Sequence, residues 1–216
     1  MNRDFNLYDL REHYTKGALL ETEVDDNPML QFQKWFGEAK EAKLPEPNAM
    51  CLSTCGKDMQ PQSRIVLLKE LDHGFVFYTN YDSKKARSLK ENPKASLNFL
   101  WLELERQVKV QGTVQKLSRA HSEQYFSKRP LDSQLGAMAS KQSSVIKSRE
   151  ELKEKLAQLK GQYNDGNPPK MPDNWGGYRL TPTQIEFWQG RPSRLHDRLV
   201  YNLQDKDKWE ISRLQP

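Results

Sequence analysis

Residues 107–112 read Gln-Val-Lys-Val-Gln-Gly, so small or apolar side chains at 108, 110 and 112 alternate with polar ones. Side chains along a strand point to opposite faces in turn, and this alternation therefore predicts a strand with one buried and one wet face. The pattern continues, and we expect the strand to span Gln107–Leu117. This strand decides the fold class because similar segments lie on both sides of it.

Those segments are rich in β-branched and apolar residues. The short connections between them contain Gly, Asp, Asn and Pro, which suits antiparallel hairpins. The expected strands are Ala49–Cys55, Gln62–Glu70, Gly74–Thr79, Ala95–Trp101, Gln107–Leu117, Gly177–Leu180, Gln184–Trp188, Asp197–Leu203 and Lys208–Arg213.

Helices are predicted around these strands. Asn27-Pro28 supplies an N-cap and a proline at the first helical position, so a helix should run to about Lys43. Its apolar positions repeat at helical spacing. They are Met29, Phe32, Phe36 and Ala39.

Two further helices are expected. Ser118–Lys128 should end before Arg129-Pro130, because a residue that precedes proline is pushed out of the α region. A capping box, Ser148-x-x-Glu151, opens the next helix, in which Glu151 and Lys155 form an i,i+4 pair. The apolar face of that helix carries Leu152, Leu156, Leu159 and Tyr163, and Asn164–Asp173 is expected to be a loop.

The order of the elements predicts a mainly β (α+β) protein, built as a small closed barrel with peripheral helices. Residues 1–26 are polar and mixed in charge, and we expect a mobile arm with a short helix around Tyr8–Tyr14. Residues 27–216 are then expected to form a single domain, which suits a chain of 216 residues.

Composition narrows the class of protein. Hydrophobic residues make up 36% of the chain, so a dimer would help to bury surface that one subunit cannot cover. No run approaches the roughly 18 apolar residues of a membrane span. Residues 1–5 lack the apolar stretch of a secretory signal, and a cytoplasmic protein is expected.

The cysteines and histidines suggest no redox or metal chemistry. Cys51 and Cys55 lie four apart in a predicted strand, roughly 13 Å between Cα atoms, which is beyond disulfide reach. We expect both to be small, reduced core residues. With two Cys and four His in the chain, no metal-ligand cluster is apparent.

The formal net charge of +5 favours anionic partners. Basic residues occur singly or in pairs among aromatic and β-branched residues, not as a basic tail or a recognition-helix stripe. This distribution favours small phosphorylated molecules over nucleic acid.

Charged and aromatic side chains concentrate near the C-terminus, where residues 185–198 contain Trp188, Arg194, His196 and Arg198. If the last three lie along one strand they project from one face, two cations flanking an imidazole. Their mutual repulsion would be relieved by an anion or an electron-rich ring among them. A solvated strand face is the alternative.

The chain also resembles a known family. The pattern I-E-F-W-Q-x4-R-L-H-D-R over 185–198 is similar to the signature of pyridoxine (pyridoxamine) 5′-phosphate oxidases. The resemblance extends in the family's order over roughly residues 10–216. It includes the segments 14–17, 64–69, 77–80, 105–108, 129–134, 140–144 and 175–177. It implies an FMN-binding split β-barrel that forms a homodimer, with flavin sites at the subunit interface and a C-terminal dimerisation and signature region.

The resemblance implies which residues would surround FMN, and each suits the task. Arg64, Lys84 and Lys85 would clamp the phosphate, since Arg offers a planar fork and Lys a mobile charge. Lys84 stands where some members have arginine. The implied FMN residues are Arg64, Ile65, Val66, Leu67, Leu68, Lys69, Tyr78, Thr79, Lys84, Lys85, Gln107, Gln142, Ser143, Trp188 and Arg198.

The same resemblance implies a second phosphate ester as substrate. Its phosphate would be held by Lys69, Tyr125, Arg129 and Ser133, and its pyridine ring by Arg194, Leu195 and His196. Arg11 and Tyr14 would belong to an arm that closes over the substrate, although Glu12 replaces a second basic residue there. Arg194 and His196 are the residues expected to act in catalysis.

The implied activity is pyridoxal 5′-phosphate synthesis. Pyridoxine 5′-phosphate or pyridoxamine 5′-phosphate would lose a hydride to the flavin, and O2 would reoxidise it to give H2O2, with NH3 released from the amine. The protein supplies positioning and electrostatics. A split-barrel flavoprotein reductase acting on another substrate and a non-catalytic FMN or pyridoxal phosphate binding protein remain alternatives. The sequence leaves open the preference between the two substrates and any regulatory product site.

Overall fold

The computed structural model describes residues 8, 10, 12–163, 167–205 and 208–216. The chain groups into two compact units. Unit 1 comprises Met1–Pro47, Asn98–Val110 and Gln184–Pro216, and unit 2 comprises Asn48–Leu97 and Gln111–Thr183. The predicted division into a mobile arm and one domain from residue 27 stays a prediction.

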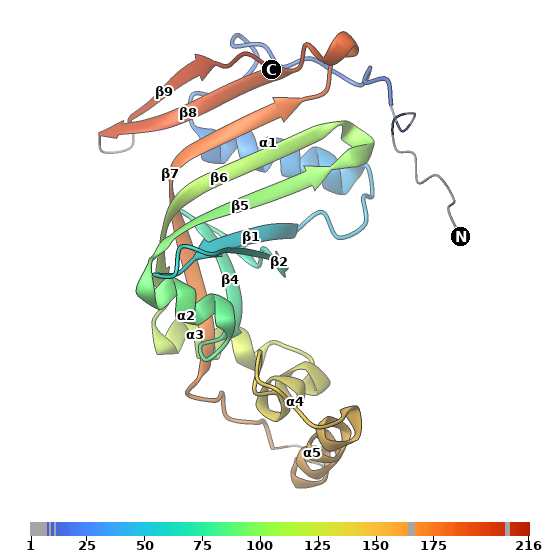
Figure 1. Cartoon of the computed structure of the whole chain (residues 1–216), viewed down its shortest axis with the longest axis vertical. Coiled ribbons are helices and arrows are strands. Elements are labelled where there is room, and N and C mark those ends of the chain that lie inside the picture. The colour runs from blue at the N-terminus through green and yellow to red at the C-terminus, as the bar shows by residue number, and fades with distance from the viewer. Residues whose placement is uncertain (1–7, 9, 11, 164–166, 206–207) are drawn as a thin grey trace. The chain divides into compact units, whose positions relative to one another are not determined.

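The described strands belong to one sheet, in the order β2-β1-β5-β6-β7-β4-β3, with β8 pairing β7 and β9 pairing β8. Figure 1 shows β8 and β9 side by side, in an antiparallel pair. The bounds are β1 Ala49–Cys55, β2 Pro61–Leu67, β3 Glu70–Leu71, β4 Phe75–Asn80, β5 Lys94–Trp101, β6 Arg106–Lys116, β7 Trp175–Gln189, β8 Asp197–Asp205 and β9 Lys208–Arg213.

The helices of the described residues are α1 Pro28–Glu41, α2 Lys84–Glu91, α3 Arg119–Ser127, α4 Leu131–Ala139 and α5 Arg149–Gln162, with 3-10 turns η1 Leu102–Leu104 and η2 Pro192–Arg194. The predicted caps at Asn27 and Ser148 are confirmed, since each accepts a backbone N–H at the start of α1 and α5, and Ser118 caps α3 in the same way. None of these helices is long and apolar enough to cross a membrane.

The core of unit 1 forms where α1 packs against strands. Phe32 lies 4.9 Å from Phe99 between ring centroids, and Trp35 makes an edge-to-face contact with Phe187 at 5.2 Å. Trp35 was not among the predicted core positions, whereas Met29 and Phe36 are only half-buried. The buried face of α1 therefore carries Phe32, Trp35 and Ala39, and Trp35 takes the place predicted for Phe36.

In unit 2, β6 passes close to β7. Val114 is buried beside Gly112 while Gln111 and Gln115 are exposed, which confirms the alternation predicted from residues 107–112. A Cβ at Gly112 would meet the carbonyl oxygen of Thr181 at 2.1 Å. Only glycine allows the two backbones this approach.

Two predictions of strand bounds were wrong, and one helix was missed. The strands expected at 177–180 and 184–188 are one continuous strand, β7, which tolerates Pro182 because a proline removes a single ladder donor. The strand expected over 62–70 stops at Leu67 and resumes as β3. Helix α4 was not predicted, because Pro130 suggested only a turn. The helix predicted to carry Leu152 on its apolar face is present as α5, and none of its described residues is buried.

Two smaller expectations were also wrong. Cys51 and Cys55 are free thiols but half-buried, since they occupy the β1 face opposite buried Met50, Leu52 and Thr54. Part of the short helix expected around Tyr8–Tyr14 lies outside the described residues, and residues 12–14 are not helical.

The segment 16–21 is bound within unit 1. The backbone N–H of Leu19 donates to Asp197 at 3.1 Å, and Arg191 donates to the carbonyl of Gly17 at 2.6 Å. Arg213 donates to Glu21 at 2.7 Å. These bonds tie the residues after Tyr14 to β8, β9 and the loop before β8.

Candidate functional site

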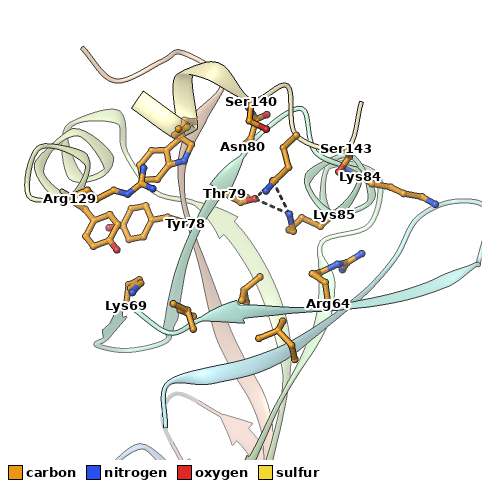
Figure 2. Close-up of a pocket in the computed structure, with 18 of the residues that line it drawn as sticks. Arg64, Lys69, Tyr78, Thr79, Asn80, Lys84, Lys85, Arg129, Ser140 and Ser143 are labelled. Atoms are coloured by element: carbon orange, nitrogen blue, oxygen red, sulfur yellow. Dashed lines mark hydrogen bonds between the residues drawn. The ribbon is translucent and has the colours of Figure 1, made fainter. Parts of the chain in front are cut away.

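A cavity of about 700 Å³ lies in unit 2. Figure 2 shows Arg129, Tyr78 and Lys69 on one side of it, Arg64, Lys84 and Lys85 on the other, and Thr79 between them. Its lining comes from β2, Lys69, β4, α2, α3, α4, the residues that flank α4 and the start of β7. The lining residues are Gln62, Arg64, Ile65, Val66, Leu67, Lys69, Tyr78, Thr79, Asn80, Lys84, Lys85, Tyr125, Arg129, Gly136, Ala137, Ser140, Gln142, Ser143 and Trp175.

The first cationic cluster of this cavity is Arg64, Lys84 and Lys85. Arg64 projects from β2 and donates to Thr54 Oγ1 at 2.8 Å, which fixes its guanidinium. Burial, and then the nearby Arg64 charge, lower the pKa of Lys85 to about 8. An anion bound here would favour the charged forms again and offset this desolvation.

Polar neighbours hold Lys85 in place. Its Nζ donates to Thr79 Oγ1 at 3.1 Å and to Gln142 Oε1 at 3.0 Å, and Thr79 also donates to Gln142 at 3.0 Å. Ser83 caps α2, and the backbone N–H of Lys84 donates to Ser143 Oγ at 3.2 Å. The start of α2 thus brings two lysines and the positive end of a helix to the cavity.

The second cationic cluster is Lys69 and Arg129, beside an aromatic wall formed by Tyr78, Tyr125 and Trp175. Tyr78 and Tyr125 stack with centroids 3.9 Å apart, and the Arg129 guanidinium lies 4.8 Å from the Trp175 centroid. Burial lowers the pKa of Arg129. Its Nη1 is buried and has no hydrogen-bond partner among the described residues. A buried guanidinium N–H without an acceptor is costly, so this position suits an anionic ligand.

A different set of predicted residues lies in unit 1. The rings of Trp188 and His196 are 4.6 Å apart, and Tyr14 lies 5.8 Å from Trp188 and 5.6 Å from His196. The backbone N–H of Arg191 donates to His196 Nδ1 at 3.1 Å. Burial, and then the Arg194 charge, lower the pKa of His196. The ring is therefore neutral near pH 7 and carries its proton on Nε2, as a donor.

Arg198 is held by a buried carboxylate. Its Nε donates to Glu186 at 2.8 Å, and Lys109 donates to the same carboxylate at 2.5 Å. The Glu186 side chain is 4% exposed, and the two donors lower its pKa although burial opposes them. Unit 1 also has a cavity of about 350 Å³, which is lined in part by Tyr14, Gln107 and Trp188.

The expectation that Arg194, His196 and Arg198 share a strand face was wrong. β8 begins only at Asp197, and Arg194 lies in turn η2, where Ser193 and Arg194 have φ values of 58° and 62°. Pro192 opens this turn. Arg194 and His196 are consequently presented by a loop, and Leu195 between them is 70% exposed.

Most predicted FMN and substrate-phosphate residues line the unit 2 cavity; five do not, two of them in unit 2 itself and three in unit 1. Leu68 is buried outside the lining, and Ser133 lies in the first turn of α4, exposed and away from it. Arg11 lies outside the described residues. Gln107, Trp188, Arg198, Tyr14, Arg194, Leu195 and His196 belong to unit 1.

Six lining residues were missed: Gln62, Asn80, Gly136, Ala137, Ser140 and Trp175. Gln62 could have been found, because it lies two residues before Arg64 on the same strand face. Asn80 and Trp175 are cross-strand partners, but that register is not visible in the sequence. Gly136, Ala137 and Ser140 lie in or next to α4, the helix that was not predicted.

Comparisons with known proteins agree on one family. Residues 36–163 match the family model described as pyridoxamine 5′-phosphate oxidase, and residues 175–216 match the pyridoxine 5′-phosphate oxidase C-terminal dimerisation region. A pyridoxine/pyridoxamine 5′-phosphate oxidase from Trichormus variabilis is 53% identical over 99% of this chain and 100% of the relative. The chain belongs to the pyridoxine/pyridoxamine 5′-phosphate oxidase family.

Other relatives support this membership. The pyridoxine/pyridoxamine 5′-phosphate oxidase of Cupriavidus metallidurans is 53% identical over 97% of this chain and 99% of its own. The solved structure of PhzG from Burkholderia lata, in complex with tetrahydrophenazine-1-carboxylic acid, superposes with a TM-score of 0.86 at 30% identity, covering 92% and 98% of the two chains. The split-barrel fold and the membership of an oxidoreductase family, both expected from the sequence, are confirmed.

Proposed function

We propose that this chain is an FMN-dependent oxidase that converts pyridoxine 5′-phosphate and pyridoxamine 5′-phosphate to pyridoxal 5′-phosphate. One observation carries the proposal: a single cavity has two separate cationic clusters, Arg64 with Lys84 and Lys85, and Lys69 with Arg129. A flavin mononucleotide and a pyridoxine phosphate each bring one phosphate, so the two clusters match the two ligands. The names of the relatives support the same pair of substrates.

The residues present fit FMN. The first cluster offers a guanidinium, two ammonium groups and a helix N-terminus to a phosphate dianion. Gln142 and Thr79 add polar atoms next to Lys85. FMN held there would supply the two-electron acceptor for the oxidation, with O2 as the final acceptor giving H2O2, and water would hydrolyse the imine formed from the amine substrate to release NH3.

The second cluster would bind the substrate's phosphate. Arg129 supplies a buried donor that has no acceptor among the described residues, and Lys69 and Tyr125 line the same cavity. Burial raises the pKa of Tyr125, so its phenol stays protonated and donates. These contacts hold the ester in one orientation, and orientation is the main contribution expected of a protein whose cofactor does the chemistry.

The predicted residues Trp188, Arg194, His196 and Arg198 lie in unit 1, and we infer that they act in a homodimer, in which they complete the cavity of the partner subunit. The match of residues 175–216 to a dimerisation region supports this, because Trp188, Arg194, His196 and Arg198 belong to it. His196 would donate from Nε2 to the pyridine ring or its substituents, and Arg194 would add a cation there. Arg198 would lie near the flavin.

Oxygen consumption tests the proposal. The purified protein should bind FMN without a covalent bond and consume O2 with pyridoxine 5′-phosphate. The unphosphorylated alcohol pyridoxine should have a kcat/KM lower by at least about 100-fold, because charge-assisted contacts to the phosphate are lost. FMN binding without turnover would instead support a non-catalytic binding protein. Equal turnover of the ester and the alcohol would remove the phosphate role of the second cluster.

A further inference from the structure

Glu70 lies on β3 directly after Lys69, and it holds two other side chains. The Tyr78 hydroxyl donates to its Oε1 at 2.5 Å, and His121 Nε2 lies 2.6 Å from its Oε2. The side chains of Glu70 and His121 are each 34% exposed. A carboxylate that bonds two groups at such distances fixes the position of both.

His121 connects this carboxylate to helix α3. His121 and Tyr125 are four residues apart on α3 and therefore lie on the same helix face. The backbone N–H of Arg129, just after the helix, donates to the carbonyl of Phe126 at 3.1 Å, so Arg129 moves with α3. Tyr125 in turn stacks on Tyr78, the other partner of Glu70.

We propose that Glu70 and His121 are positioning residues for the second cationic cluster, tying the β3–β4 hairpin to α3 so that Tyr78, Tyr125 and Arg129 keep the arrangement that receives the substrate's phosphate. The proposal rests on the function proposed above. Neither Glu70 nor His121 lines the cavity, so neither contacts the ligand. Their effect acts through Tyr78 and α3.

Electrostatics alone predicts the opposite effect of removing Glu70. A carboxylate near an anion site repels a phosphate, so its removal would strengthen binding if charge were all that mattered. If Glu70 instead positions the aromatic wall and Arg129, its removal weakens binding. The sign of the change in KM therefore distinguishes a positioning role of Glu70 from simple charge repulsion.

The experiment compares Glu70→Ala, His121→Leu and the double variant with a control, Glu123→Ala. Glu123 also lies on α3 and also forms an ion pair, with Arg119 at 2.8 Å, but it is away from the cavity. KM and kcat for pyridoxine 5′-phosphate and the dissociation constant of FMN are measured for each holoenzyme. Glu70→Ala should raise KM about ten-fold, because a displaced Arg129 would lose a charge-assisted contact to the phosphate. FMN affinity should change less than about two-fold.

The double variant should raise KM no more than Glu70→Ala alone, because both single changes act through one carboxylate. A lower KM for Glu70→Ala, a rise no larger than that of Glu123→Ala, or an equal loss of FMN affinity would overturn the proposal. If Glu70→Ala does not fold, His121→Leu decides, since it leaves the Tyr78–Glu70 bond in place. If the wild-type enzyme shows no turnover, the proposed function is contradicted but the positioning role of Glu70 and His121 is not. Binding of pyridoxal 5′-phosphate to the same variants then tests that role. Glu70→Ala should weaken this binding while leaving FMN affinity nearly unchanged.

Discussion

At the scale of single residues, the cavity combines buried cations that are costly in the free protein. Lys85 is 8% exposed and its ammonium group is desolvated. Arg129 has a buried donor without a partner in the described chain. Such groups are stabilised when an anion binds. They therefore lower the stability of the ligand-free protein and raise its affinity for anions.

Lys85→Met tests this exchange. The pKa of Lys85 is lowered from 10.5 to about 8, so between these values the unfolded chain binds more protons and the folded state gains stability as pH rises. Below pH 8 the buried charge costs at most about 3.4 kcal/mol. Flavin-free Lys85→Met should therefore be more stable than wild type at pH 7 and bind FMN more weakly.

Urea unfolding of both flavin-free proteins at pH 7 and pH 10 measures this difference. The advantage of the variant should shrink toward pH 10. Lys84→Met is the matched control, because Lys84 is exposed, and its free energy of unfolding should change by less than about 0.5 kcal/mol. A variant that is less stable than wild type at pH 7 would show that the bonds of Lys85 to Thr79 and Gln142 outweigh its desolvation.

Arg129→Ala should mainly raise KM for pyridoxine 5′-phosphate, because the phosphate is held equally in the ground state and the transition state. The expected loss is roughly 1.5–3 kcal/mol, or about 10- to 100-fold. Arg119→Ala serves as the control, since Arg119 pairs with Glu123 and Asp173 on the surface. A fall in kcat at unchanged KM would be incompatible with the phosphate role.

At the scale of elements, the backbones of β6 and β7 approach each other closely within unit 2. The Cβ of an alanine at Gly112 would meet Thr181 O at 2.1 Å, and backbone cannot move aside cheaply. Gly112→Ala should therefore lower the free energy of unfolding by more than about 2 kcal/mol.

Gly161→Ala on α5 provides the comparison. Nothing lies within 4 Å of an added Cβ there, and alanine is the better helix former. This variant should gain about 0.5 kcal/mol in chemical denaturation. Equal effects of the two substitutions would show that the β6–β7 approach is not the constraint.

At the scale of the whole molecule, the predicted site residues divide between unit 1 and unit 2. If unit 1 of one subunit completes the cavity of its partner, two defective chains can complement each other. A heterodimer of Arg129→Ala and Arg194→Ala would place both defects in one site and leave the other site wild type. A single-chain site would leave one defect in each.

Co-expression of the two variants tests the shared site. With random pairing, half of the dimers are mixed and each has one intact site, so activity well below KM should reach about a quarter of wild type, above either variant alone. Activity no higher than the average of the two variants would place both residues in a site within one chain.

The amino-acid sequence determined the family, the strand-rich fold and most residues of the cavity. The strand-rich fold follows from local signals, namely alternation over residues 107–112 and caps at Asn27 and Ser148, whereas the family and the cavity residues follow from the resemblance carried by motifs such as residues 64–69. Local spacing sets which face a side chain takes within one element. The signals therefore survive in the sequence without knowledge of partners.

Tertiary structure alone decided what depends on distant partners. The Glu70–His121 bond joins residues 51 apart in sequence, and Trp175 reaches the cavity through its pairing with Asn80. The turn at Ser193 and Arg194 has a left-handed backbone that no local periodicity predicts. Spacing and composition report only local preference, so pairings between residues distant in the sequence are not visible in them.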